Sequence, residues 1–309
     1  MRTVFWKELA DHFGSKRFII FLFLIVIVAG ASVYLAGQSL GENPEQTGSF
    51  VFLKLFTSTS GGLPSFLYFL AFFGPLIGVL LGFDAVNSEF ARGTVSRVLA
   101  QPIYRHSWIN AKFLAGLAAL GLALAGIILI IFGLGLFMLG FGPEGGEISR
   151  IAAFYAIGLV YLGFWLSMGI LFSILFRQAA SSALTSIALW LFFALFLYMI
   201  GGLIADQIAP VELDSPVEVW SQHENIRDLV LRFSPVTLFE EATSAILIPS
   251  YRGIGMAQLM TRGDLPTNPL PLGQSFLIVW PQLVSLLALT SICFAVSYVT
   301  FMRREIRST

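Results

Sequence analysis

The chain has 309 residues, of which 57% are hydrophobic and 12% are charged, and its formal net charge is zero. An ordinary soluble domain carries about 25% charged residues, so this composition indicates an integral membrane protein and argues against a soluble enzyme. Cys293 is the only cysteine, which excludes a disulfide within the chain.

Six apolar runs follow one another along the chain. Each is long enough to cross a hydrocarbon core of about 30 Å, which takes roughly 20 helical residues. None of the six contains Asp, Glu, Lys, Arg or His, so no proton relay or ion site within the membrane is indicated. An even number of spans places both termini on the same side. The predicted spans are residues 18–36, 64–83, 113–141, 151–175, 181–205 and 275–301.

Basic residues are concentrated on one side of this arrangement. Of the 18 Lys and Arg residues, 12 lie in the terminal segments and in the segments after the second and fourth spans. By the positive-inside rule that side is cytoplasmic. We therefore expect a multi-pass protein of a prokaryotic inner membrane with both termini in the cytoplasm. The four basic segments are residues 1–17, 84–112, 176–180 and 302–309.

Residues 1–17 mix apolar and basic side chains, which is typical of a helix lying at the cytoplasmic membrane interface. The alternative is a frayed basic leader that only sets the topology. Ala29-Gly30-Ala31 has the form of a signal-peptidase site, but the apolar run continues past it to Leu35. We therefore expect the first span to be retained. Residues 18–309 then form the six-span domain.

The second span contains a stripe of glycines at four-residue intervals, Gly74, Gly78 and Gly82. Such small residues lie on one helix face and allow a neighbouring backbone to approach closely. The stripe predicts helix packing, either against another helix of the same chain or against a second subunit. Pro75, next to the first glycine, predicts a kink.

Residues 206–274 separate the fifth and sixth spans on the outer side. Apolar side chains at helical spacing predict two short amphipathic helices there. Ser234 and Pro235 suit the N-cap and first position of the second helix. The proline-rich stretch 265–271 favours a stiff extended connector, and we expect the loop to form a small external cap. The predicted apolar faces are Ile226, Leu229, Val230 and Phe233, then Val236, Phe239, Thr243 and Ile246.

Several motifs of catalytic chemistry are missing from the sequence. There is no GxxxxGK[ST] phosphate-binding loop, no HExxH and no CxxC. The three histidines, His12, His106 and His223, are scattered, which argues against a metal site. If this protein does energy-dependent work, another chain must supply the ATPase.

The polar block of residues 84–112 is the most informative segment for function. A short helix is predicted from Asn87 or Ser88, either of which suits an N-cap, through Leu99. Its apolar ridge is flanked by charges, and Pro102 disfavours its continuation. Such a helix, lying across the ends of two spans, suits a groove on a soluble partner. The alternative is a solvated loop whose arginines only enforce the topology.

This block resembles the loop between the second and third spans in permease subunits of type-2 ABC transporters. The resemblance rests on Ser88-Glu89, Gly93-Thr94, Leu99, Pro102, Arg105 and Lys112. Three further stretches are similar to that family. They are Trp6-Lys7-Glu8-Leu9, Phe233-Ser234-Pro235, and Phe301-Met302-Arg303-Arg304-Glu305-Ile306.

The resemblance implies an all-α fold of six spans with an N-terminal interfacial helix, a cytoplasmic coupling helix and an outer loop of short helices. Two permeases, identical or similar, would pair and bind two cytoplasmic ATPases, which would carry ATP and Mg²⁺. No cofactor on this chain and no nucleic acid is implied. The implied docking residues are Glu89, Arg92, Gly93, Thr94, Arg97 and Leu99, with Pro102 and Arg105 closing the helix.

The outer loop of this chain is longer than in many members. Subgroups with such loops include permeases linked to maturation of nitrous oxide reductase, but no Met or His cluster supports copper supply here.

The sequence thus predicts a permease subunit of an ATP-driven transporter that moves an amphipathic or lipophilic substrate outward. It is not expected to be an enzyme itself. One alternative is a non-transporting sensor or scaffold that uses the same ATPase contact. The other is a membrane-embedded enzyme, for which the spans offer only Ser, Thr, Tyr and Cys293 as reactive groups.

Overall fold

The computed structural model describes residues 1–42, 50–93, 104–212, 215–250 and 269–304. Six helices within this part of the chain are long and apolar enough to cross a membrane, so the predicted all-α fold with six spans is confirmed. The spans are Lys16–Gly41, Phe66–Ala91, Arg105–Leu139, Gly145–Leu175, Ala179–Ile208 and Trp280–Arg303.

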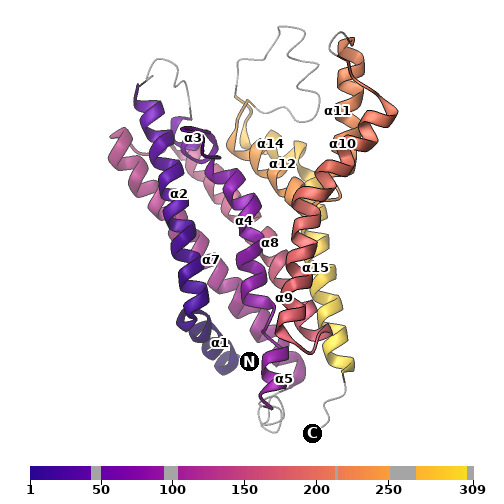
Figure 1. The fold of residues 1–309 in the computed structure, drawn as a ribbon. Helices are drawn as coiled ribbons and strands as arrows, with labels where there is room; N and C mark the ends of the chain where they lie inside the picture. The colour runs from indigo at the N-terminus through magenta and orange to yellow at the C-terminus, as the bar shows by residue number, and fades with distance from the viewer. Residues whose placement is uncertain (43–49, 94–103, 213–214, 251–268, 305–309) are drawn as a thin grey trace.

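The helices run along a common direction, and α1 and the end of α15 lie at the same end of the bundle (Figure 1). We call this the terminal end and the opposite one the distal end. The helices are α1 (Arg2–Gly14), α2 (Lys16–Glu42), α3 (Val51–Thr57), α4 (Phe66–Gly82), α5 (Asn87–Ala91), α7 (Arg105–Leu139), α8 (Gly145–Leu175), α9 (Ala179–Leu191), the π-helical turn η2 (Phe192–Phe196), α10 (Leu197–Ile208), α11 (Val217–Leu231), α12 (Pro235–Leu247), α14 (Leu272–Ile278) and α15 (Trp280–Arg303).

The third and fourth spans begin earlier than the apolar runs predicted, and their added turns carry buried charges. Lys112 lies in α7, and Glu147 and Arg150 lie in α8. Glu147 accepts a 2.8 Å hydrogen bond from the N–H of Phe52 at the start of α3. Arg150 donates a 2.6 Å hydrogen bond to the carbonyl of Ile246 at the end of α12. The two charges thereby satisfy the unpaired backbone groups of two helix ends.

The glycine stripe of α4 packs against α8 of the same chain. A Cβ at Gly78 would lie 2.9 Å from the carbonyl oxygen of Leu162, and one at Gly82 would lie 2.7 Å from that of Leu166. Gly169 of α8 lies directly opposite Gly82. Of the two alternatives for the stripe, the contact within the chain is the one that the structure contains.

Part of the segment predicted as an external cap lies between the spans instead. Helix α12 packs against α4, α8 and α15, and almost its whole length is buried. The hydroxyl of Ser234, just before α12, donates to the carbonyl of Phe193 in η2, about halfway along the fifth span. Helices α11 and α12 therefore form a hairpin whose turn reaches mid-span height, where Ser234 satisfies a carbonyl of the π-helical turn.

Both predicted helices of this hairpin are present, but the predicted apolar face is confirmed only for α12 and is partly wrong for α11. Ser234 caps α12 by accepting from the N–H of Val236, and Pro235 is its first residue. The predicted apolar face of α12 is buried. Leu229 of α11 and Phe233, two residues after its end, are 61% and 77% exposed, whereas Leu231 is buried. The reason is that α11 packs mainly against α10, which covers a different side of the helix.

Candidate functional site

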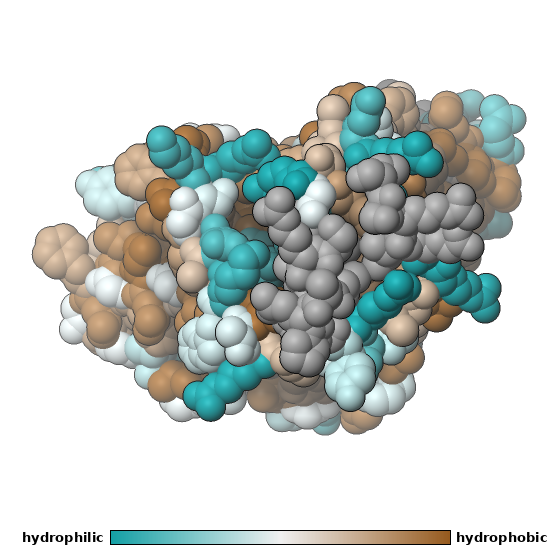
Figure 2. All heavy atoms as spheres, turned by 90° about the horizontal axis from the view of Figure 1, so that it is seen from below, coloured by the Kyte–Doolittle hydropathy of each residue, from teal (hydrophilic) through white to brown (hydrophobic). Residues whose placement is uncertain are grey.

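The candidate site lies at the terminal end, where α1, α5 and α7 meet. Helix α1 packs along the start of α7, and α5 continues the chain just beyond α4. Seen from this end, hydrophilic side chains gather between apolar ones (Figure 2). The expected helix near the N-terminus is present as α1, while its place at a membrane surface stays a prediction.

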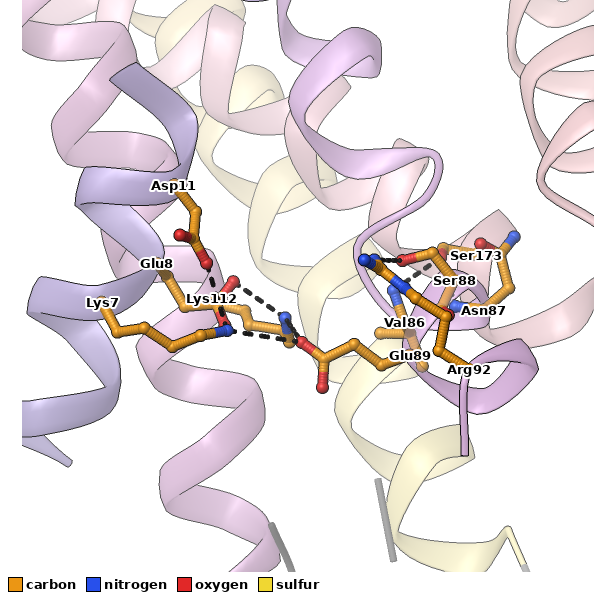
Figure 3. A network of polar contacts seen from close by, with 10 residues as sticks. All are labelled: Lys7, Glu8, Asp11, Val86, Asn87, Ser88, Glu89, Arg92, Lys112 and Ser173. Atoms are coloured by element: carbon orange, nitrogen blue, oxygen red, sulfur yellow. Dashed lines mark hydrogen bonds and ion pairs between the residues drawn. The ribbon is translucent and has the colours of Figure 1, made fainter. Parts of the chain in front are cut away.

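A buried lysine joins the three helices. The ammonium of Lys112 in α7 donates a 2.8 Å hydrogen bond to Glu8 of α1 and a 2.6 Å hydrogen bond to Glu89 of α5. The Lys112 side chain is only 3% exposed, and its Nζ atom lies 4.7 Å from the ring centroid of Trp108. Lys7 extends the cluster with 3.1 Å contacts to Glu8 and to Asp11 (Figure 3).

The electrostatics of this cluster favour the ionised forms of Glu8 and Lys7. Burial of Glu8 disfavours the carboxylate, but the charges and hydrogen bonds of Lys112 and Lys7 outweigh burial and lower the pKa of Glu8. Burial also lowers the pKa of Lys7, but Glu8 and Asp11 reverse that effect and raise it overall. Because a buried charge without a partner is very costly, the buried members Glu8, Glu89 and Lys112 depend on one another.

The start of α5 is held by α8 rather than by its own side chains. The hydroxyl of Ser173 accepts hydrogen bonds of 2.8 Å and 3.0 Å from the N–H groups of Val86 and Asn87. The prediction that Asn87 or Ser88 caps this helix is therefore wrong: the Asn87 side chain instead donates to the carbonyl of Phe83. Ser173 of another span supplies the acceptor that an N-cap side chain normally provides.

The end of α5 also differs from the prediction of one continuous helix through Leu99. Helix α5 ends at Ala91, and Gly93 has a φ of 67°, the left-handed conformation that commonly terminates helices at glycine. The continuation, including Thr94, Arg97, Leu99 and Pro102, lies outside the described residues.

The last span secures α5 from the other side. The guanidinium of Arg304 lies 4.4 Å from the ring centroid of Phe90 and donates a 2.5 Å hydrogen bond to the carbonyl of Ile174 in α8. Arg105 donates to the carbonyl of Arg304 at 3.4 Å. Helix α5 is thus attached to α1, α7, α8 and the segment after α15.

The predicted docking residues do not all face outward. Glu89 is buried in the Lys112 cluster, whereas Arg92 and Arg105 are exposed. Arg92 folds back on Ser88 and donates to its carbonyl and its hydroxyl. The docking role of these residues stays a prediction, but Glu89 is placed to position α5 rather than to offer a surface.

Sequence reasoning missed the roles of Glu8 and Ser173. Glu8 follows Lys7 in Trp6-Lys7-Glu8-Leu9, and Lys112 directly precedes an apolar run. An acid in the segment before the first span and a base at the start of the third were the available signal for this ion pair.

The fold and this site define a multi-pass α-helical membrane protein whose second span ends in a short helix fixed by a buried ion cluster. The sequence matches the pattern of the ABC-2 family transporter proteins over residues 2–306. The chain therefore belongs to this family, as its resemblance predicted, and is a membrane permease subunit of an ABC transporter.

Two curated relatives share this assignment. The chain is 27% identical over 225 residues to the probable ABC transporter permease protein NosY of Stutzerimonas stutzeri, a match that covers 73% of this chain and 67% of that protein. It is 28% identical over 201 residues to the protein of the same name in Pseudomonas aeruginosa, covering 62% of this chain and 66% of that protein. The matches span about two thirds of each relative's length.

Proposed function

We propose that this chain is the translocation subunit of an ATP-driven exporter, and that α5 with its continuation docks a separate ATPase. The observation that carries the proposal is the attachment of α5 to α1 and α7 through Lys112, in a chain matched to the family over nearly its whole length. A second copy would complete the translocation path, and each copy would bind one ATPase carrying ATP and Mg²⁺.

The contacts of α5 support its use as a lever. A force on α5 would reach α7 and α1 through Lys112, and α8 through Ser173. It would also reach α4 directly, because α5 continues the same span. Since α4 and α8 are in backbone contact at Gly82 and Gly169, these two spans would move as one body.

The charge distribution supports the proposed orientation. The terminal end contains α1, Arg92, Arg105 and Arg304, and by the positive-inside rule these basic residues favour a cytoplasmic position. The protein would then lie in a prokaryotic inner membrane, with its α11–α12 hairpin entering the bundle from the outer side. The apolar spans favour an amphipathic or lipophilic substrate.

Co-purification of the tagged chain from its native membrane tests the proposal. We expect a nucleotide-binding subunit in equal amount and ATP hydrolysis in the eluate. Arg97→Glu should reduce retention of that subunit at least about tenfold, because reversing an interfacial charge costs on the order of 1.4 kcal/mol or more. Arg177→Glu is the matched control, since Arg177 is likewise an arginine but lies, exposed, in the segment between α8 and α9.

Three outcomes of this experiment have different meanings. Loss of the subunit with Arg97→Glu but not with Arg177→Glu supports docking through this segment. Recovery of the chain alone, with no ATP hydrolysis, contradicts the proposed transport role. Unchanged retention with Arg97→Glu contradicts the docking surface while leaving the family assignment in place.

A further inference from the structure

An open cavity of about 700 Å³ lies at the terminal end, between α1, the start of α2 and the α4–α5 segment. Its inner wall contains Glu8, Glu89 and Lys112 of the ion cluster. Apolar side chains, including Phe18 and Leu80, line it beside the charged ones. The cavity therefore presents charge and apolar surface together, at the height where the first span begins.

Most of the charges that line the cavity are paired. Lys112 and Lys7 contact the carboxylates of α1 and α5, and Arg17 lies 3.3 Å from Asp84. Lys16 and Arg92 also line the cavity and are exposed, and neither forms an ion pair with a carboxylate of the described residues. Two cations are thus available to an anion that enters the cavity.

Apolar stripes lead away from this charged region along two spans. On α2, Ile20, Leu24 and Ile27 follow Lys16 at helical spacing, so they share its face, and all three are exposed. On α4, Leu76 and Phe73 precede the cavity residue Leu80 at the same spacing and are half-buried. A ligand with a charged end in the cavity can therefore extend an apolar chain along either span.

We propose that this cavity binds the phosphate of an anionic phospholipid, with Lys16 and Arg92 as its cationic ligands and the acyl chains along α2 and α4. Basic pockets between transmembrane helices are suited to anionic headgroups, and guanidinium and ammonium groups form strong charge-assisted hydrogen bonds with phosphate. The site does not depend on the ATPase contact. Because Arg92 directly follows α5, the lipid would also help to hold α5 in place.

Native mass spectrometry of the purified permease, titrated with phosphatidylglycerol, measures this binding. We expect Lys16→Gln/Arg92→Gln to weaken binding at least about tenfold, since each basic group near a lipid phosphate contributes about 1 kcal/mol. Arg177→Gln removes an exposed cation outside the cavity and should leave binding unchanged. Asp84→Asn removes the carboxylate that competes for Arg17 and should tighten binding.

Two further ligands identify the source of the phosphate. Phosphatidylcholine should bind more weakly than phosphatidylglycerol, and glycerol phosphate, which has no acyl chains, should bind more weakly still. Equal affinity of glycerol phosphate would identify a soluble phosphate compound and overturn the lipid assignment. Equal affinity of the double variant, or weaker binding with Asp84→Asn, would overturn the site.

Lys16→Gln alone separates this proposal from the docking of the ATPase, because Lys16 is not among the docking residues. Weaker lipid binding with full retention of the ATPase subunit is the expected result. Full lipid binding with loss of the subunit would contradict the lipid site and give Lys16 a role in docking.

Discussion

The hydroxyl of Tyr161 in α8 donates a 2.5 Å hydrogen bond to the carbonyl of Ala71, which stands four residues before Pro75 in α4. Proline has no N–H, so the carbonyl four residues earlier in the helix loses its usual partner. The indole of Trp190 donates to the next carbonyl, that of Phe72, at 3.0 Å. Side chains from the fourth and fifth spans therefore satisfy the backbone groups at Pro75.

Tyr161→Phe is expected to lower the free energy of unfolding by about 1–3 kcal/mol, because it leaves the buried carbonyl of Ala71 without a partner. Thermal unfolding in detergent measures the change. Tyr155→Phe is the matched control. Its hydroxyl donates to the carbonyl of Gly121, which stands four residues before Ala125 and so keeps a helical partner. Its effect should be small.

Pro75→Ala distinguishes this explanation from a general loss of packing at Tyr161. Alanine restores an N–H that can bond to Ala71, so Tyr161→Phe should cost less in the Pro75→Ala background. An equal cost in both backgrounds would show that the hydroxyl does not act through the proline.

Lys112→Met is expected to destabilise the terminal end strongly. It leaves Glu8 and Glu89 buried without their shared cation, and breaking a buried ion pair costs about 3–5 kcal/mol. Lys7→Met belongs to the same cluster, but the Lys7 side chain is 60% exposed, so its loss should cost less than about 1 kcal/mol. Thermal unfolding and retention of the ATPase subunit should both show this difference.

Removing the two carboxylates tests the same cluster from the opposite side. The triple variant Lys112→Met/Glu8→Gln/Glu89→Gln contains no unpaired buried charge and should recover much of the lost stability. If the triple variant is less stable than Lys112→Met, the cost does not arise from the two carboxylates.

The parts of the fold that local sequence determines were predictable. The lengths of the apolar runs predicted the six spans. Ser234-Pro235 predicted the start of α12, because an N-cap acts within one helical turn. The position of α12 between the spans was not predictable, since its apolar face does not reveal which helices cover it. Burial of Leu231 instead of Leu229 follows from the same dependence on tertiary packing.

The candidate site was predictable as a segment but not as a set of contacts. The charges of residues 84–112 identified this segment as a candidate site, and its residue pattern indicated the family, which the family match confirms. Lys112, however, pairs with Glu8 across 104 positions, and Ser173 caps α5 from 86 positions away. No helical period connects residues so distant, so these contacts and the inward orientation of Glu89 emerge only from the packed structure.

Glu240 of α12 is expected to make the stability of the protein depend on pH. Burial, together with the neighbouring charge of Glu241, raises the pKa of Glu240 from 4.5 to about 7. A raised folded-state pKa contributes stability that is fully present below the unfolded value of 4.5 and is lost as pH rises through about 7. Between pH 5 and pH 8 the loss is at most roughly 3 kcal/mol, and partial solvent exposure reduces it.

Glu240→Gln should abolish this part of the pH dependence and stabilise the protein at pH 8, because glutamine stays neutral in the same place. Unfolding temperatures at pH 5 and pH 8 provide the measurement. Glu218→Gln, an exposed acid in α11, is the control and should leave the pH dependence unchanged. The same fall in stability in Glu240→Gln as in the unmodified protein would assign the effect to another group.

Gly82→Ala tests how closely α4 and α8 are joined beside α5. The added Cβ would lie 2.7 Å from the carbonyl oxygen of Leu166 and 2.8 Å from the nitrogen of Ile170. Both atoms are backbone and cannot rotate away, so the helices must separate, at a cost of about 1–3 kcal/mol.

Gly133→Ala in α7 is the matched control, because no atom lies within 4 Å of its added Cβ. Alanine is the better helix former by about 1 kcal/mol, so Gly133→Ala should be neutral or stabilising. Thermal unfolding should therefore show a loss of stability for Gly82→Ala and none for Gly133→Ala, and an equal loss in both would contradict close backbone packing at Gly82.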